Sequence, residues 1–292
     1  MLDLVTAGEA FDDLVFHGLA RLPRHGEEIR TDRLQRAPGG GAVITAIAAS
    51  RLGLQCAMLG GLSREAARVL GAEDVRVRNL RRSGEAGPMT VSISTARDRA
   101  FVTFNGMNHR LPARLRRALP RVRARHVHLA FCPRSCRPWK SVVNSLRRKG
   151  IGTSWDFGWN PSLAADPHFL ALVTSVDYLF VNRDEAVVYA GARSLTHALD
   201  RWRRSPTLVV VKLGAAGARI VGPDIDVREK GVAVRVVDTT GAGDAFNAGF
   251  LAGRLRGLDL RAALQLANRV GALSTRRAGG LAGLPRIRVA RA

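Results

Sequence analysis

A glycine-rich turn leads into an apolar helix near the carboxyl end of the chain, in the stretch Val236-Val237-Asp238-Thr239-Thr240-Gly241-Ala242-Gly243-Asp244-Ala245-Phe246. The valines predict a strand that ends at Asp238, and the residues after Gly243 predict a helix. The N–H groups of Gly241, Ala242 and Gly243 then meet at a helix N-terminus, which favours an anion. Asp244 adds a carboxylate that is suited to accept a proton beside a bound phosphate. The alternative is a tight connection that uses its glycines for steric reasons alone.

Outward from this turn, short β-branched or apolar runs alternate with helical patterns. The segment Ala42–Leu52 is apolar on nearly every side and is followed by Gly53, and Asp259 can cap a second helix. Alternating strands and helices predict an α/β fold with a mainly parallel sheet that is covered on both faces. We find no repeat or linker, so one domain over residues 1–292 is expected. The predicted strands are Leu4–Ala7, Gln55–Leu59, His126–Phe131, Gly152–Trp155, Tyr178–Val181 and Leu208–Val211.

Two stretches break this alternation, residues 14–36 and residues 88–108. The second has alternating apolar residues from Thr90 to Phe104, and a turn signal at Arg97-Asp98-Arg99 predicts a hairpin. A small sheet that stands off an α/β core is a natural lid over a site. We therefore expect a small β lid made from these two segments.

The formal net charge of +22 favours anionic partners in general. Only four of the 46 basic residues are lysines, and the arginines are spread along the whole chain. The densest stretch, residues 113–125, has no aromatic side chain to stack on a base. We expect a solvated arginine-rich surface, and we do not expect nucleic acid as a partner.

The amino terminus has neither the basic start nor the apolar core of a signal peptide, and no apolar run is long enough to span a bilayer. Three cysteines are too few for a disulfide framework, so reduced thiols are expected. Together these features predict a cytoplasmic protein without a membrane partner. The series His126, His128, Cys132 and Cys136 resembles zinc-ligand spacing, but its alternation favours a strand.

The turn from Asp238 to Asp244 resembles the C-terminal signature of the ribokinase-type carbohydrate kinases, the PfkB family. It is not a P-loop, since the chain has no G-x-x-x-x-G-K-[ST] motif. The resemblance implies a three-layer ribokinase-like fold with a mainly parallel central sheet and a small β lid. It also implies ATP-dependent transfer of the γ-phosphate to a hydroxyl of a sugar-like acceptor. Asp244 is then the base, and the N–H groups of Gly241, Ala242 and Gly243 form the anion hole.

On the acceptor side, Asp13 resembles the family aspartate that grips sugar hydroxyls, and the glycines Gly39, Gly40 and Gly41 resemble the family's glycine motif. A surface-turn role for Asp13 is the alternative. The family's sugar-binding asparagine is replaced by Ile44, and the segment 62–74 is short. These departures leave the acceptor open, including a nucleoside. They also keep open a non-catalytic ligand-binding or nucleic-acid-binding protein of the same fold.

The resemblance extends to the nucleotide side. Asn182 and Glu185 match the family's N-x-x-E element, which implies contact with Mg²⁺ through water, although Glu185 also suits a helix cap. The turn that contains Lys212, Gly214 and Gly217 resembles the family's nucleotide-side turn, and Asn268 lies on the helix that borders the adenine. Asp238 either holds its turn or helps to bind a monovalent cation such as K⁺. A homodimer through the lid is also left open.

Overall fold

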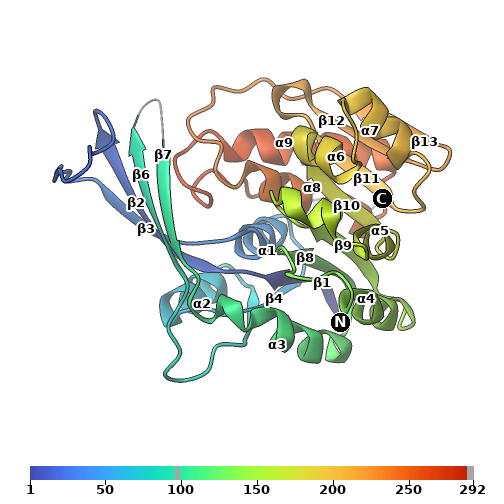
Figure 1. Ribbon diagram of the computed structural model, residues 1–292, viewed down its shortest axis with the longest axis horizontal. Coiled ribbons are helices and arrows are strands. Elements are labelled where there is room, and N and C mark those ends of the chain that lie inside the picture. Colours follow the sequence, from blue (N-terminus) through green and yellow to red (C-terminus); the bar gives the residue numbers. More distant parts are fainter. Residues whose placement is uncertain (96–98, 288–292) are drawn as a thin grey trace.

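The computed structural model describes residues 1–95 and 99–287, which form two β-sheets and the helices that cover the larger sheet (Figure 1). The strands are β1 (Leu2–Gly8), β2 (Phe11–Leu19), β3 (Leu34–Gly39), β4 (Cys56–Gly60), β5 (Arg76–Asn79), β6 (Met89–Thr95), β7 (Arg99–Phe104), β8 (Ala124–Ala130), β9 (Gly152–Asp156), β10 (Tyr178–Asn182), β11 (Leu208–Lys212), β12 (Ala218–Gly222) and β13 (Ile225–Glu229). The α-helices are α1 (Gly41–Arg51), α2 (Arg64–Ala72), α3 (Leu111–Ala118), α4 (Trp139–Arg147), α5 (Phe169–Val173), α6 (Arg183–Tyr189), α7 (Leu195–Trp202), α8 (Ala242–Leu255) and α9 (Leu260–Ser274).

The larger sheet has nine strands in the order β13-β12-β11-β10-β9-β8-β1-β4-β5. The strands from β5 to β11 in this order pair in parallel, and β12 and β13 continue the sheet as antiparallel strands. The six strands predicted between Leu4 and Val211 each overlap one strand of this sheet. The predicted α/β class and the mainly parallel sheet are confirmed.

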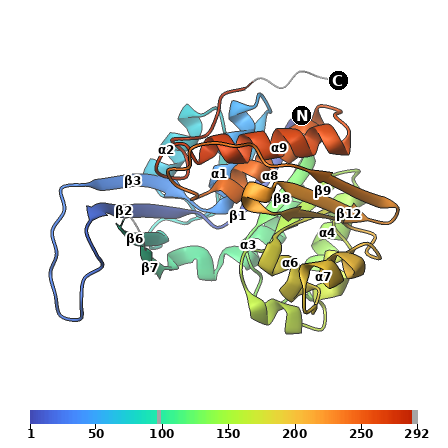
Figure 2. The same cartoon turned by 90° about the horizontal axis from the view of Figure 1, so that it is seen from above.

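Helices cover both faces of the larger sheet, which gives the predicted three layers (Figure 2). One face packs against α1, α2, α8 and α9, and the other packs against α3, α4, α6 and α7. Buried strands of this kind carry continuous apolar runs, as in Val209–Val211 of β11. Two predicted helix ends are confirmed. Gly53 follows α1 with a φ of 88°, and the Asp259 side chain caps α9 by accepting from the N–H of Ala262.

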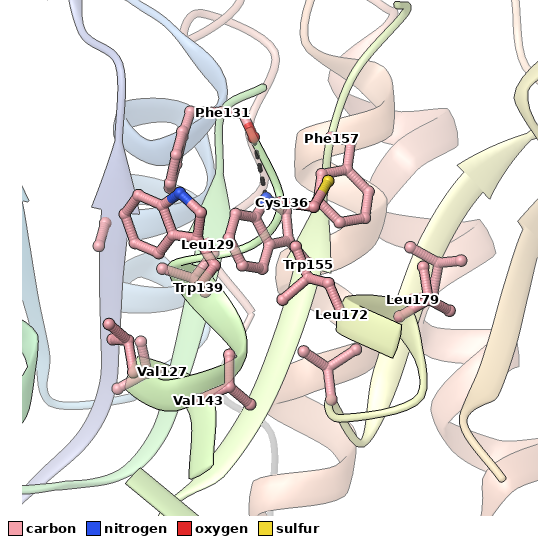
Figure 3. Close-up of a cluster of buried hydrophobic side chains, with 14 of the residues drawn as sticks. Val127, Leu129, Phe131, Cys136, Trp139, Val143, Trp155, Phe157, Leu172 and Leu179 are labelled. Atoms are coloured by element: carbon pink, nitrogen blue, oxygen red, sulfur yellow. Dashed lines mark hydrogen bonds between the residues drawn. The ribbon is translucent and has the colours of Figure 1, made fainter. Parts of the chain in front are cut away.

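An aromatic cluster fills the layer between β8, β9 and α4 (Figure 3). Trp139 and Trp155 meet edge to face, with ring centroids 5.3 Å apart, and Phe131 contacts both. The indole N–H of Trp155 donates to the carbonyl of Phe131 over 2.8 Å, so this buried polar group is satisfied. The cluster packs at the carboxyl ends of β8 and β9, and these ends border the candidate site.

The smaller sheet has the order β3-β2-β6-β7 and stands away from the helical layers (Figure 1). The strands β6 and β7 pair antiparallel as expected, and the predicted turn at Arg97-Asp98 lies outside the described residues. The four strands cover half of the positions in the predicted lid segments, and residues 20–33 are not part of a strand. The strand register places the side chains of one face together, namely Leu14, Phe16, Leu34, Met89, Val91, Val102 and Phe104.

The predicted strand before the glycine-rich turn is wrong. Residues 231–237 form no strand, and Val236 and Val237 are exposed. The N–H groups of Val237 and Asp238 donate to the carbonyl of Thr275 after α9, so this segment is held by a helix end instead of a sheet. The valine pair has the local propensity of a strand, but it has no neighbouring strand to pair with.

Within the described residues, no helix is long and apolar enough to cross a membrane. All three cysteines are free. No cluster of three or more His, Cys, Asp and Glu side chains suited to a metal ion occurs in this part of the chain, so His126 and His128 do not join the cysteines in a zinc site.

Candidate active site

Asp244 lies in the first turn of α8, where this helix meets α1. A Cβ added to Gly41 would lie 2.8 Å from Asp244 Oδ1, so the absence of a side chain at Gly41 makes room for the carboxylate. Burial raises the pKa of Asp244 to about 7, and the negative charges of Asp156 and Glu185 act in the same direction against Lys212. A carboxyl group of this pKa is suited to accept a proton near neutral pH.

An ion pair lies next to Asp244 at the carboxyl ends of β9 and β11. Lys212 Nζ lies 2.7 Å from Asp156 Oδ2, and the Asn247 side-chain amide donates to the same oxygen over 2.8 Å. Burial alone would raise the pKa of Asp156, but the cation and the amide lower it. The pair also adjoins α8, because a Cβ on Gly243 would lie 3.3 Å from Lys212 Nζ.

Asn182 and Glu185 form a reciprocal cap at the start of α6. The Asn182 side chain accepts from the N–H of Glu185 over 2.9 Å, and the Glu185 carboxylate accepts from the N–H of Asn182 over 2.8 Å. The alternative considered for Glu185, a helix cap, is therefore present. Burial, followed by the charge of Asp156, raises the pKa of Glu185, so the carboxylate belongs to the same electrostatic cluster as Asp156 and Asp244.

Asp13 faces the glycine motif from the smaller sheet. It lies inside β2 opposite β3, and a Cβ on Gly39 would lie 1.8 Å from Asp13 Oδ2. The first strand, β1, ends at Gly8, and Asp13 lies in β2 and not in a surface turn. Burial, with the neighbouring Asp12, raises the pKa of Asp13 to about 6. Asp12 accepts from the Ser63 hydroxyl, whereas Asp13 has no hydrogen-bond partner among the described residues.

The glycine motif continues into α1. Gly40 has a φ of 98°, and a side chain there would meet the carbonyl of Glu9 at 2.4 Å, so this turn requires glycine. Gly41 then begins α1 directly below Asp244. The absence of side chains at these glycines therefore lets Asp13 of β2 and Asp244 of α8 approach the same turn.

Asp238 holds the loop before α8. Its Oδ1 accepts from the N–H and hydroxyl of Thr240, and its Oδ2 accepts from the N–H of Gly279. Gly241 has a φ of 73° and caps α8, and the Ala242 N–H donates to the carbonyl of Thr239. Of the three expected anion-hole donors, that of Ala242 is therefore engaged within the turn.

The remaining predicted nucleotide-side residues surround the end of β11. Gly214 and Gly217 both have positive φ, and a Cβ on Gly217 would meet the carbonyl of Glu229 at 2.1 Å. The Asn268 side chain donates to the carbonyl of Lys230 over 3.0 Å. These contacts hold the turn after β11 against the segment after β13.

Two residues of this cluster, Asn247 and Asp156, were not among the site residues predicted from the sequence. The signal for Asn247 was its position three residues after Asp244, which places both side chains on one face of α8. Near Asp156 along the chain, Trp155 is in the core, Trp159 is exposed, and Asn160 caps a short 3₁₀ turn at Pro161–Ala165.

The arrangement of sheet, glycine turn and carboxylates has counterparts among known proteins. The model of the pfkB family carbohydrate kinases matches residues 1–287. The chain belongs to the PfkB family of carbohydrate kinases. This membership makes it a sugar kinase, a phosphotransferase that acts on an alcohol group.

Relatives of this PfkB protein, and solved structures that are similar to it, agree with the family. Ribokinase of Bacillus subtilis is 26% identical, over 98% of this chain and 97% of its own length. ATP-dependent ribose-1-phosphate kinase of Halopiger xanaduensis is 29% identical, over 96% and 94%. The structure of Arabidopsis thaliana ribokinase complexed with ribose and ATP has a TM-score of 0.77 at 22% identity and covers 97% of this chain and 96% of its own. The structural likeness confirms the ribokinase-like fold.

Proposed function

We propose that this PfkB protein transfers the γ-phosphate of ATP to a hydroxyl of a sugar or sugar-like acceptor, with Asp244 as the general base. The observation that carries the proposal is the place of Asp244, a carboxylate with a pKa of about 7 at the start of α8, directly above Gly41. Asp13, with no partner among the described residues, and the backbone of Gly39–Gly41 position the acceptor on one side of this carboxylate. The first turn of α8, from Gly241 to Gly243, faces the transferring group on the other side.

In this mechanism the acceptor hydroxyl loses its proton to Asp244 as its oxygen attacks the γ-phosphorus. The bond from the γ-phosphorus to the β,γ-bridging oxygen breaks, and ADP leaves. Lys212 is held by Asp156 and compensates negative charge beside the first turn of α8. The carboxylates of Glu185, Asp156 and Asp244 make a field that attracts a divalent cation, and Asn182 with Glu185 would hold Mg²⁺ through water. A Mg²⁺ ion bound there with ATP would neutralise negative charge on the phosphates. The Asp238 contacts support its role in holding the loop, and a K⁺ ion near it stays a prediction.

The test is ADP release from Mg-ATP with a panel of acceptors. The panel contains pentoses, hexoses, sugar phosphates, keto-deoxy sugar acids and nucleosides, so it separates a sugar kinase from a nucleoside kinase. Asp244→Asn is the control for catalysis. Acceptor-stimulated release that this variant loses supports the proposal. A folded, ATP-binding protein that is silent with every acceptor favours a non-catalytic protein of the same fold, for which salt-dependent DNA binding is then measured.

The smaller sheet supports a second part of the proposal, a homodimer through the lid. Asp13 lies on one face of this sheet. The other face carries Leu34, Met89, Val102 and Phe104, which are 43%, 39%, 70% and 57% exposed. An apolar sheet face of this kind is typical of an interaction surface. Light scattering measures the mass in solution, and a dimer that Val102→Glu converts to a monomer supports this interface.

A further inference from the structure

A cavity of about 430 Å³ lies at the opposite edge of the larger sheet from Asp244. It opens between the amino ends of β8, β9 and β10, the end of α4 and the last turns of α8. Its size falls in the range of small-molecule sites. Its charged lining consists of Arg147, Arg254 and Asp177, together with the imidazole of His126.

The cavity presents hydrogen-bond donors that are not fully used. Arg147 has no hydrogen-bond or ion-pair partner among the described residues, while Arg254 contacts the carbonyl of Leu258 and the Tyr178 hydroxyl. Asp177 is already engaged, since its Oδ2 accepts from the N–H and hydroxyl of Thr153. Guanidinium groups suit phosphate because their N–H groups match its oxygens.

His126 connects this cavity to the interior. Its Nδ1 lies over Gly152, where an added Cβ would be 2.6 Å away, and Gly152 also lines the cavity. Its Nε2 lies 2.8 Å from the hydroxyl of Ser154, and this hydroxyl lies 2.9 Å from His128 Nδ1. Burial lowers the pKa of both histidines, to about 3 for His126 and about 4 for His128, so both rings are neutral near pH 7.

The inner end of this chain is His128 Nε2, a buried atom without a hydrogen-bond partner among the described residues. His128 Nε2, Thr6 Oγ1 and Asn247 Oδ1 are all buried without a hydrogen-bond partner. Thr6 is the register neighbour of His128 on β1, and the charges of Asp156 and Lys212 act on His128. The amide of Asn247 donates to Asp156, so its Oδ1 is an acceptor that needs a donor.

A single serine proton couples the two rings. Ser154 can donate to only one imidazole and accepts from the other. In the inner state, Ser154 donates to His128 Nδ1, and His128 carries its proton on the buried Nε2. In the outer state, Ser154 donates to His126 Nε2, and His126 Nδ1–H faces the cavity. Each ring keeps one proton in both states, so the exchange requires no net gain or loss of protons.

We propose that this cavity binds the phosphoryl group of a small molecule, and that the chain His126–Ser154–His128 transmits its binding to the Asn247–Asp156–Lys212 cluster by exchange of ring tautomers. An anion requires a donor at His126 Nδ1 and therefore selects the outer state. This state leaves His128 Nε2 without a proton, which changes the dipole of the ring on which the charges of Asp156 and Lys212 act. The cavity thus acts as an effector site at the sheet edge opposite the catalytic base.

The experiment follows the imidazole nitrogens of the full chain, labelled with ¹⁵N-histidine, during titration with inorganic phosphate at constant ionic strength. We expect the N–H to move from Nε2 to Nδ1 in both His126 and His128. Ser154→Ala should restrict the response to His126. Arg147→Ala should abolish it, whereas Arg148→Ala, which removes the neighbouring charge outside the cavity, should leave it intact.

Three results would overturn the proposal. His126 that does not respond to phosphate rejects the anion site. Equal weakening by Arg147→Ala and Arg148→Ala shows general attraction to a basic surface. If His126 responds to phosphate in the unmodified protein and His128 does not, the relay is rejected. This outcome does not depend on whether the Ser154→Ala variant folds. Because none of these readouts uses turnover, they are independent of the proposed kinase activity.

Discussion

Lys212 Nζ and Asp156 Oδ2 lie 2.7 Å apart, and the two side chains are only 15% and 11% exposed. The pair therefore places a cation and an anion beside Asp244 at fixed positions. Lys212 lowers the pKa of Asp244 and Asp156 raises it, so the pair adjusts the base without adding net charge. Asn247 fixes the orientation of the pair from the same helix that carries Asp244.

The pH dependence of turnover should follow Asp244. Because the base must be deprotonated, we expect kcat/KM to fall as the pH drops below about 7. Asp244→Asn should lower kcat about 10²–10⁴-fold at pH 8. Steady-state ADP release between pH 5.5 and 9 measures both effects. A rate that stays level down to pH 5.5 contradicts the assignment.

The ionised form of Asp244 should also lower the stability of the folded protein. Its folded pKa is about 7 and its usual value is 3.8, so folding loses stability as the pH rises from about 4 to about 7. Asp244→Asn removes this penalty, and we expect its Tm at pH 8 to exceed that of the unmodified protein by at least about 2 °C. The difference should disappear near pH 4. Thermal unfolding at the two pH values is the measurement, and an equal difference at both would exclude this cause.

Lys212→Met should leave Asp156 as an uncompensated charge and destabilise the fold by about 3–5 kcal/mol. The same change should move the pH profile of kcat/KM to higher pH, since Lys212 lowers the pKa of Asp244. Adding Asp156→Asn removes both charges, so the double variant should recover stability and the original profile. A double variant as unstable as Lys212→Met would argue against the ion pair as the cause. Denaturant unfolding and pH profiles complete the cycle.

Gly41→Ala should impair catalysis because its Cβ would lie 2.8 Å from Asp244 Oδ1. The backbone of Gly41 does not have a positive φ, so alanine itself is compatible with the start of α1. We expect kcat to fall at least about 10-fold, since small displacements of a catalytic group are costly. Gly71→Ala in α2 is the matched control, because its Cβ would meet nothing within 4 Å. Equal activity of the two variants would reject the contact.

Glu185→Gln separates a magnesium role from a capping role. Glutamine can accept the Asn182 N–H as glutamate does, so the cap and the Tm should be retained. If the carboxylate also acts on Mg²⁺, we expect the Mg²⁺ concentration for half-maximal rate to rise several-fold. Glu185→Ala, which loses the cap, serves as the comparison for stability. An unchanged Mg²⁺ dependence in Glu185→Gln leaves the cap as its role.

The sequence predicted the sheet, the helices that cover it and the smaller sheet, because apolar periodicity and turn residues act locally. Through a family resemblance it also placed Asp244 and the glycine motif in one site, and Gly41 does lie against Asp244. It did not predict that Lys212 pairs with Asp156. Their separation is 56 residues, and only the register of β9, β10 and β11 brings them together. The strand expected at Val236–Asp238 failed for a related reason, since its partner is the end of α9 and not another strand.

Ile44 occupies the position at which the family resemblance led us to expect an asparagine that reaches the sugar. Its side chain is 5% exposed, and its Cδ1 would lie 2.8 Å from a Cβ on Gly241 and 2.9 Å from one on Gly280. The isoleucine therefore supports the turn at Gly241, which we propose faces the phosphate. For protein engineering, acceptor preference and phosphate handling are then not independent traits at this position. A polar residue introduced at Ile44 to broaden the acceptor range would also loosen the turn that begins α8, so such a change needs a compensating apolar contact near Gly280.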